Sequence, residues 1–167
     1  MDILSRIPLV SKVRRNHALE HATIHILNQR YPHIRLMGRS APGSFYIYGD
    51  IEAEIVRAAA EEALARLKRG EKGLAVHPRC GTNLATAGVL AGLSAFFIMS
   101  GRSRSRLAKL PEVLFAATVA VILAQPLGWA IQKHITTSTE LDGVFIRGVS
   151  RQAVGGIATH RVDVGQE

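Results

Sequence analysis

The densest group of residues suited to metal binding and proton transfer lies near the N-terminus. His17, His21 and His25 follow one another at strict four-residue spacing. Glu20 directly precedes the second of these histidines. Positions four apart stack on one face of a helix, and two imidazoles one turn apart can bind the same Zn²⁺. The spacing therefore predicts a zinc site on His17 and His21. The competing interpretation is a solvated polar face, opposite the apolar stripe of the same helix.

A second group with ligand chemistry comes directly before the first long apolar run. His77 and Cys80 are two metal-binding residue types at a spacing compatible with one ion. If this loop folds back on the first helix, either residue can complete a site begun by His17 and His21. The alternative is a tight structural entry into the apolar helix, with Cys80 as a small buried hydrophobe and Thr82 or Asn83 as the helix cap.

The five residues from His17 to His21 match the pattern His-x-x-Glu-His and so resemble the inverzincin (pitrilysin-type) metallopeptidases. The resemblance implies that His17 and His21 are zinc ligands. It also implies that Glu20 is the catalytic base that takes a proton from the attacking water. Those enzymes take a third ligand, a glutamate, from a later helix. On the second predicted helix of this chain the candidate carboxylates are Glu54, Glu61 and Glu62, none at the family's distance.

Two uncharged apolar runs dominate the second half of the chain. The first covers residues 83–100, and the second is uncharged from Val113 to Ile131 within a predicted span of about 113–133. Each is long enough to cross a hydrocarbon core of about 30 Å as a helix. Gly88 and Gly92 stand four apart on the first run, which allows another helix to approach closely. We expect this face to pack on the second span, and the alternative is contact with a membrane-protein partner or a second copy.

The remaining segments predict a mixed helix and strand domain. An apolar stripe indicates a helix from about Val13 to Gln29, and alanine-rich sequence capped by Asp50 and ended by Gly70 indicates a second. Alternation and turn residues predict strands at four places: 34–37, 44–48, 144–147 and 157–164. A lone hairpin is marginal in water, so the last two strands, which flank Gly155–Gly156, are expected to join the N-terminal sheet.

The predicted fold class is therefore α+β with an insertion. A basic helix-hairpin-helix domain occupies residues 1–82, a two-helix transmembrane hairpin occupies 83–135, and a C-terminal β segment over 136–167 packs on the first domain. The single cysteine excludes an intrachain disulfide.

The charge of the chain indicates both its expected partners and its orientation in the membrane. The chain has 21 Lys and Arg against 13 Asp and Glu, yet aromatic residues make up only 5%. That is too few for a base-stacking platform, so we expect a lipid bilayer and no nucleic acid as partner. The basic loop 101–111 favours a cytoplasmic position by the positive-inside rule. Comparable charge flanks the outer ends of both spans, and no export signal is visible. We therefore expect both termini in the cytoplasm.

The whole chain also resembles a group of small bacterial membrane proteins without an assigned activity, of the type found in cyanobacteria and filamentous phototrophs. The resemblance is carried by His17–Ala22 and by Leu74–Leu84 ahead of the two-span hairpin. It implies a location in the bacterial inner membrane.

These observations predict a membrane-anchored metal-binding protein, in the form of a zinc-dependent hydrolase or peptidase of inverzincin type. The competing expectation is a non-catalytic small subunit or assembly factor of a larger membrane complex.

Overall fold

The structure is a computed structural model that describes residues 7–101 and 105–167. The chain divides into two compact units. One combines the segment up to His77 with Lys133–Glu167, and the other is Pro78–Gln132. The predicted α+β fold with an inserted pair of apolar helices is confirmed. Part of the basic loop, residues 102–104, lies outside the described residues.

The first unit contains two long helices, α1 (Pro8–Arg30) and α2 (Ala53–Lys68). Proline suits the first turn of α1 because an amide there has no partner within the helix. Gly70 ends α2 as predicted, with a φ of +94°. The predicted cap at Asp50 is wrong: Glu52 precedes the helix without a side-chain cap. The carboxylate of Asp50 instead pairs with Arg151 at 2.9 Å.

Four antiparallel strands form one sheet in the order β1-β2-β4-β3. They are β1 (Met37–Ala41), β2 (Ser44–Tyr48), β3 (Val144–Val154) and β4 (Ile157–Gln166). The C-terminal hairpin therefore joins the N-terminal sheet, as expected. Gly155 and Gly156 have φ values of +59° and +80°, which suit the tight turn between β3 and β4. The prediction of a strand at 34–37 is wrong, because β1 begins only at Met37 and continues to Ala41.

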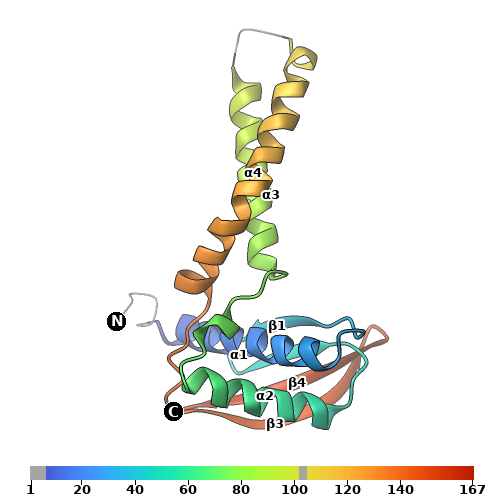
Figure 1. The fold of residues 1–167 in the computed structure, drawn as a ribbon, viewed down its shortest axis with the longest axis vertical. Helices are drawn as coiled ribbons and strands as arrows, with labels where there is room; N and C mark the ends of the chain where they lie inside the picture. The colour runs from blue at the N-terminus through green and yellow to red at the C-terminus, as the bar shows by residue number, and fades with distance from the viewer. Residues whose placement is uncertain (1–6, 102–104) are drawn as a thin grey trace. The chain divides into compact units, whose positions relative to one another are not determined.

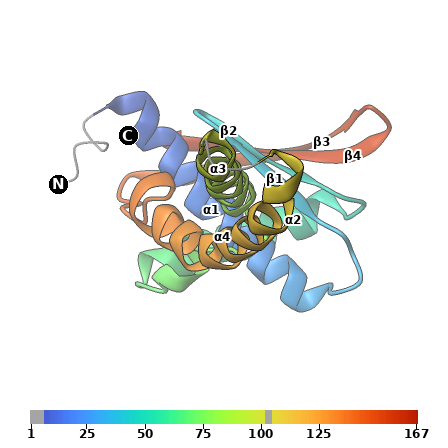
Figure 2. The ribbon, with the colours of Figure 1, turned by 90° about the horizontal axis from the view of Figure 1, so that it is seen from above.

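Helices α1 and α2 cover one face of this sheet (Figures 1 and 2). The core between the layers is fully buried and apolar, and its largest members are Leu19, Ile26, Leu27, Phe45, Ile47 and Leu67. The polar sequence of β1 is explained by its position. It is an edge strand, and a side chain at Gly38 would overlap the Glu20 carboxylate of α1. An apolar alternating pattern is therefore missing where the strand forms.

The second unit is a pair of helices, α3 (Gly81–Ser100) and α4 (Leu110–Ile131), which lie side by side along their length (Figure 1). Both are long and apolar enough to span a membrane. A short 3-10 helix (Leu107–Lys109) precedes α4, and a π-helical segment (Gln132–Thr136) follows it.

The contact between α3 and α4 uses other residues than the sequence predicts. The amide of Gln132 donates to Asn83 Oδ1 at 2.6 Å, and a side chain at Gly128 would overlap Asn83. By contrast, a Cβ added at Gly88 or Gly92 would meet no described atom within 4 Å. The prediction that the Gly88–Gly92 face packs on the second apolar helix is therefore wrong.

Candidate metal centre

The histidine row on α1 is a packed cluster and not a solvated face. His21 is only 2% exposed, and the rings of His17 and His21 have centroids 4.2 Å apart with planes at 60°. With Zn–N bonds of about 2.0–2.1 Å, two imidazoles on one tetrahedral zinc have centroids about 5 Å apart. A shift of about 1 Å would bring this pair to the spacing of ligands on one ion.

Backbone carbonyls fix the chemical state of both rings. His17 Nδ1 lies 3.0 Å from the Thr136 carbonyl oxygen, and His21 Nδ1 lies 2.7 Å from that of Ala75. Because a carbonyl oxygen only accepts, each Nδ1 carries the hydrogen. The lone pair of each neutral ring is then on Nε2. Metal-binding histidines are held in this way, with the second nitrogen donating to a carbonyl or carboxylate.

The two carbonyls come from short irregular helices on either side of the apolar unit in sequence. Ala75 ends a 3-10 helix (Lys72–Ala75), and Thr136 ends the π-helical segment. Arg14 holds the segment around Thr136 against α1. Its guanidinium donates to the His134 carbonyl at 3.0 Å, and its own carbonyl accepts from the Ser138 amide. The sequence reasoning missed these partners. Backbone carbonyls carry no residue-type signal, so no local pattern could have identified them.

His77 and His25 extend the row. The ring of His77 lies 5.8 Å from that of His21 and 4.9 Å from that of His25, measured between centroids. His25 uses the opposite nitrogen from its neighbours, with Nε2 donating to the Val76 carbonyl at 2.9 Å. Four imidazoles from two segments far apart in sequence are thus brought together within the first unit.

Cys80 stands at the start of α3 and is partly buried. Its Sγ accepts from the Thr82 amide at 3.4 Å, so the cysteine itself caps this helix. The predicted cap by Thr82 or Asn83 is wrong, and the Asn83 amide group instead donates to the Pro78 carbonyl. Cys80 belongs to the second unit and follows His77, the last residue of this segment of the first unit, by three residues.

Glu20 lies against the sheet. Its side chain is 5% exposed, and Oε2 accepts from the Ser40 hydroxyl of β1 at 2.5 Å. Burial raises the pKa of Glu20, while the Ser40 hydrogen bond and the positive charge that His17 carries when protonated act in the opposite direction. Glu20 thus joins α1 to β1 and also lies within electrostatic reach of His17.

The carboxylates of α2 do not supply a third ligand of the inverzincin kind. Glu61 pairs with Arg57 at 3.1 Å, and Glu62 pairs with Arg30, both in exposed positions. Both carboxylates are thus engaged in ion pairs with arginines and not with the histidine row. In this respect the chain departs from the inverzincin arrangement.

Comparison with known proteins agrees with the second resemblance found in the sequence. The family described as Domain of unknown function (DUF6391) matches residues 12–149. An uncharacterised protein of the cyanobacterium Picosynechococcus sp. is 37% identical over 144 residues, which cover 78% of this chain and 68% of that relative. No solved structure matches significantly. The matched range includes the histidine row, both apolar helices and the start of β3, and the chain therefore belongs to the DUF6391 family.

Proposed function

We propose that this chain is a membrane-anchored metal-binding protein whose ion is Zn²⁺, held by His17 and His21 with Cys80 and His77 as the further ligands. The observation that carries the proposal is the pair of Nδ1 hydrogen bonds to backbone carbonyls. They present the Nε2 lone pairs of two rings only 4.2 Å apart at their centroids. Imidazole nitrogen combined with a cysteine thiolate is a ligand set that favours zinc over magnesium or calcium.

The short loop between His77 and Cys80 supports their common role. Three residues of extended chain span at most about 10 Å, so Cys80 stays near His77 whatever the direction in which α3 leaves the loop. His77 in turn packs its ring against His21.

Membrane anchoring through α3 and α4 is the second part of the proposal. Strands β2 and β4 pair directly, although both apolar helices lie between them in sequence. A chain that crosses a bilayer through α3 and returns through α4 places both strands on one side, as this sheet requires. The expected side is the cytoplasm of a bacterial inner membrane. A C-terminal green fluorescent protein fusion should fluoresce, whereas activity of a C-terminal alkaline phosphatase fusion would contradict this orientation.

The metal is tested by elemental analysis of the full chain purified in detergent without chelators. About one zinc per chain is expected in the wild type, and little in the His17→Ala/His21→Ala variant. His33→Ala is the matched control, because His33 is exposed and lies outside the row. Wild-type protein without metal that also fails to take up added zinc would overturn the proposal. It would favour the alternative of a non-catalytic subunit of a membrane complex.

A hydrolase is the more specific form of this function, and the position of Glu20 favours it. Glu20 directly precedes His21 and lies within electrostatic reach of His17. Bound zinc would supply a water molecule of lowered pKa, and Glu20 would be the carboxylate that accepts its proton. In a screen with fluorogenic peptides, Glu20→Gln should abolish hydrolysis while zinc content is unchanged. Glu61→Gln, an exposed carboxylate of α2, is the control. Full activity in Glu20→Gln would rule out this mechanism.

A further inference from the structure

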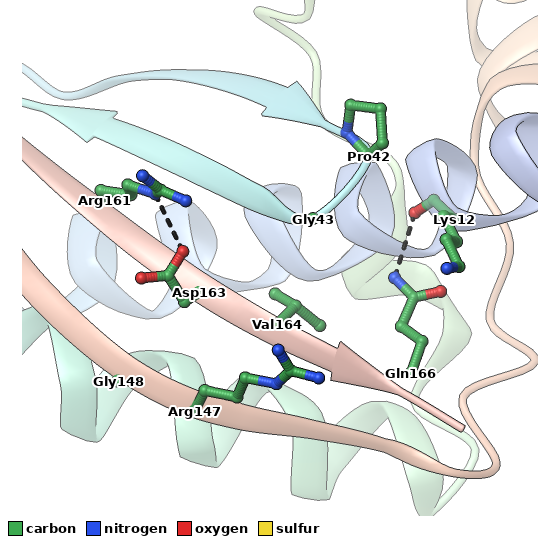
Figure 3. Close-up of a pocket in the computed structure, with 9 residues that line it drawn as sticks. All are labelled: Lys12, Pro42, Gly43, Arg147, Gly148, Arg161, Asp163, Val164 and Gln166. Atoms are coloured by element: carbon green, nitrogen blue, oxygen red, sulfur yellow. Dashed lines mark hydrogen bonds and ion pairs between the residues drawn. The ribbon is translucent and has the colours of Figure 1, made fainter.

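A basic cavity opens on the first unit and takes no part in the metal site proposed above. It has a volume of about 550 Å³ and is formed by α1, the β1–β2 turn, β3 and the end of β4 (Figure 3). Lys12, Arg147 and Arg161 contribute cationic side chains to its lining. Cavities of roughly 300–1,000 Å³ are the usual size for small-molecule sites in proteins.

The charge of this cavity is only partly compensated. Asp163 is the one acidic residue in its lining, and Arg161 Nε lies 2.8 Å from Asp163 Oδ1. Three cations and one anion leave a net charge of +2 on the lining. Within the described ranges, neither Lys12 nor Arg147 forms an ion pair. An anion entering the cavity would therefore meet two cationic groups that are not already bound to a carboxylate.

A β-bulge places Arg147 in this lining. Ile146 pairs with Val164 and Gly148 pairs with Asp163, so Arg147 is the extra residue between two regular pairs. Bulges of this kind change the direction of a side chain and are frequent beside functional sites. The next residue, Gly148, adds no side chain to the lining, which keeps the cavity open.

The neighbouring ring holds the guanidinium of Arg147 in place. Its Cζ lies 5.7 Å from the centroid of the Phe145 ring, a cation–π distance. The ring of Phe145 in turn lies over Gly165, where an added side chain would overlap it. The position of Arg147 is thus set by a series of contacts on the outer face of the β3–β4 hairpin.

Gln166 fixes the second side of the cavity. Its amide donates to the Lys12 carbonyl at 3.3 Å and to Asn16 Oδ1 at 2.8 Å. These bonds tie the last residues of β4 to α1. Lys12 is consequently held opposite the β3–β4 hairpin that carries Arg147 and Arg161 (Figure 3).

We propose that this cavity binds the phosphate group of a small organic phosphate. Two arginines with planar donor forks suit the oxygens of a phosphate group, and a lysine adds a point charge. The volume leaves room for an organic part beside the phosphate. The same chemistry occurs in a soluble metabolite and in the headgroup of an anionic phospholipid.

The test uses the full chain in dodecyl maltoside, a detergent without phosphate, at constant ionic strength set with potassium chloride. Inorganic phosphate and glycerol 3-phosphate are titrated by calorimetry. Saturable binding is expected, weakened about ten- to a hundredfold in Arg147→Gln, since hydrogen bonds to charged groups are of that strength. Arg35→Gln, an exposed arginine outside the cavity, should bind as the wild type does. No saturable binding of either probe, or equal weakening in both variants, would overturn the proposal.

A second arm identifies the source of the phosphate. Phosphatidylglycerol or a neutral diacylglycerol is added to the micelles before the titration. A higher apparent Kd with phosphatidylglycerol alone means that the lipid headgroup competes for the cavity. An unchanged Kd with both lipids assigns the cavity to a soluble phosphate.

Discussion

The two units of this protein place their large apolar side chains in opposite ways. In the α/β unit the large apolar side chains are inside, with Leu19 and Phe45 at 0% exposure. In the helical unit Phe97 and Phe115 are 69% and 73% exposed, whereas the polar residues Lys109 and Gln132 are buried. The first unit is organised as in water. The second turns its large apolar side chains outward, which suits a surrounding of lipid.

The contrast shows that different forces hold the two units together. Burial of apolar surface away from water stabilises the sheet and its two helices. Between α3 and α4 that force is weak if lipid surrounds them, and close approach at small residues and polar contacts takes its place. Gly128 against Asn83 and the hydrogen bond from Gln132 are contacts of this second kind.

The largest expected difference between the two units is seen when one phenylalanine of each is replaced by alanine. Phe45→Ala should cost about 3–5 kcal/mol of the free energy of unfolding, because it leaves a cavity in a closed core. Phe115→Ala should cost less than about 0.5 kcal/mol, since the ring has little packing to lose. Urea unfolding in detergent, followed by circular dichroism, measures both. Similar losses would show that the helical unit has a core of the ordinary kind.

A smaller effect on stability is expected at the glycines of the α3–α4 pair. Gly128→Ala should separate α3 from α4 and cost about 1–3 kcal/mol, because the new methyl group overlaps Asn83. Gly92→Ala serves as the control, since its position is open. Unfolding in sodium dodecyl sulfate can be followed through Trp129, the single tryptophan of the chain. A greater loss in Gly92→Ala would mean that its face is the one used in contacts.

Lys109, the buried cation of the α3–α4 pair, should stabilise the C-terminal end of α3 by about 0.5–2 kcal/mol and affect no other part of the pair. Lys109 Nζ donates to the Ile98 carbonyl at 3.1 Å and to the Gly101 carbonyl, at the C-terminus of α3. Lys109→Met should speed hydrogen exchange of the amides in that last turn. The exposed Lys133→Met should leave their exchange unchanged. Equal rates in both variants would contradict this role for Lys109.

The smallest effect concerns His160, which is buried in the sheet. Burial lowers the pKa of His160, so the folded protein resists protonation while the unfolded chain accepts it near pH 6.5. Stability is therefore lost as pH falls from about 6.5 toward the lowered pKa. The melting temperature of His160→Gln should fall less over this window than that of the wild type. His33→Gln is the control, and identical slopes in His160→Gln and the wild type would exclude the effect.

Several elements were predictable because their signals are local. The uncharged runs that became α3 and α4 need only length and composition, and β2 follows from a short aromatic alternation. Gly70 and the Gly155–Gly156 turn were predictable because their positive φ angles favour glycine. The edge strand β1 was misplaced for the converse reason. Gly38 is there to make room for Glu20, a contact between distant segments.

The candidate sites divide in the same way. Four-residue spacing was enough to pick out His17 and His21, because helical periodicity is a local property. Whether those rings are solvated or packed, and which nitrogen carries the hydrogen, depends on carbonyls of Ala75 and Thr136. No local pattern in the sequence indicates the basic cavity, since Lys12 of α1 and Arg147 of β3 line it together only after the helix packs on the sheet.

By itself, then, the sequence determined the apolar helices, most of the other helices and strands, the glycine turns, and the residue types able to bind a metal. These depend on side-chain chemistry and on the periods of helix and strand. The tertiary structure decided the position of β1, the contact face of α3, the caps of α2 and α3, and the tautomers of the histidine row. Each of these depends on which backbone atoms meet across long stretches of chain, and no local pattern of residues encodes that.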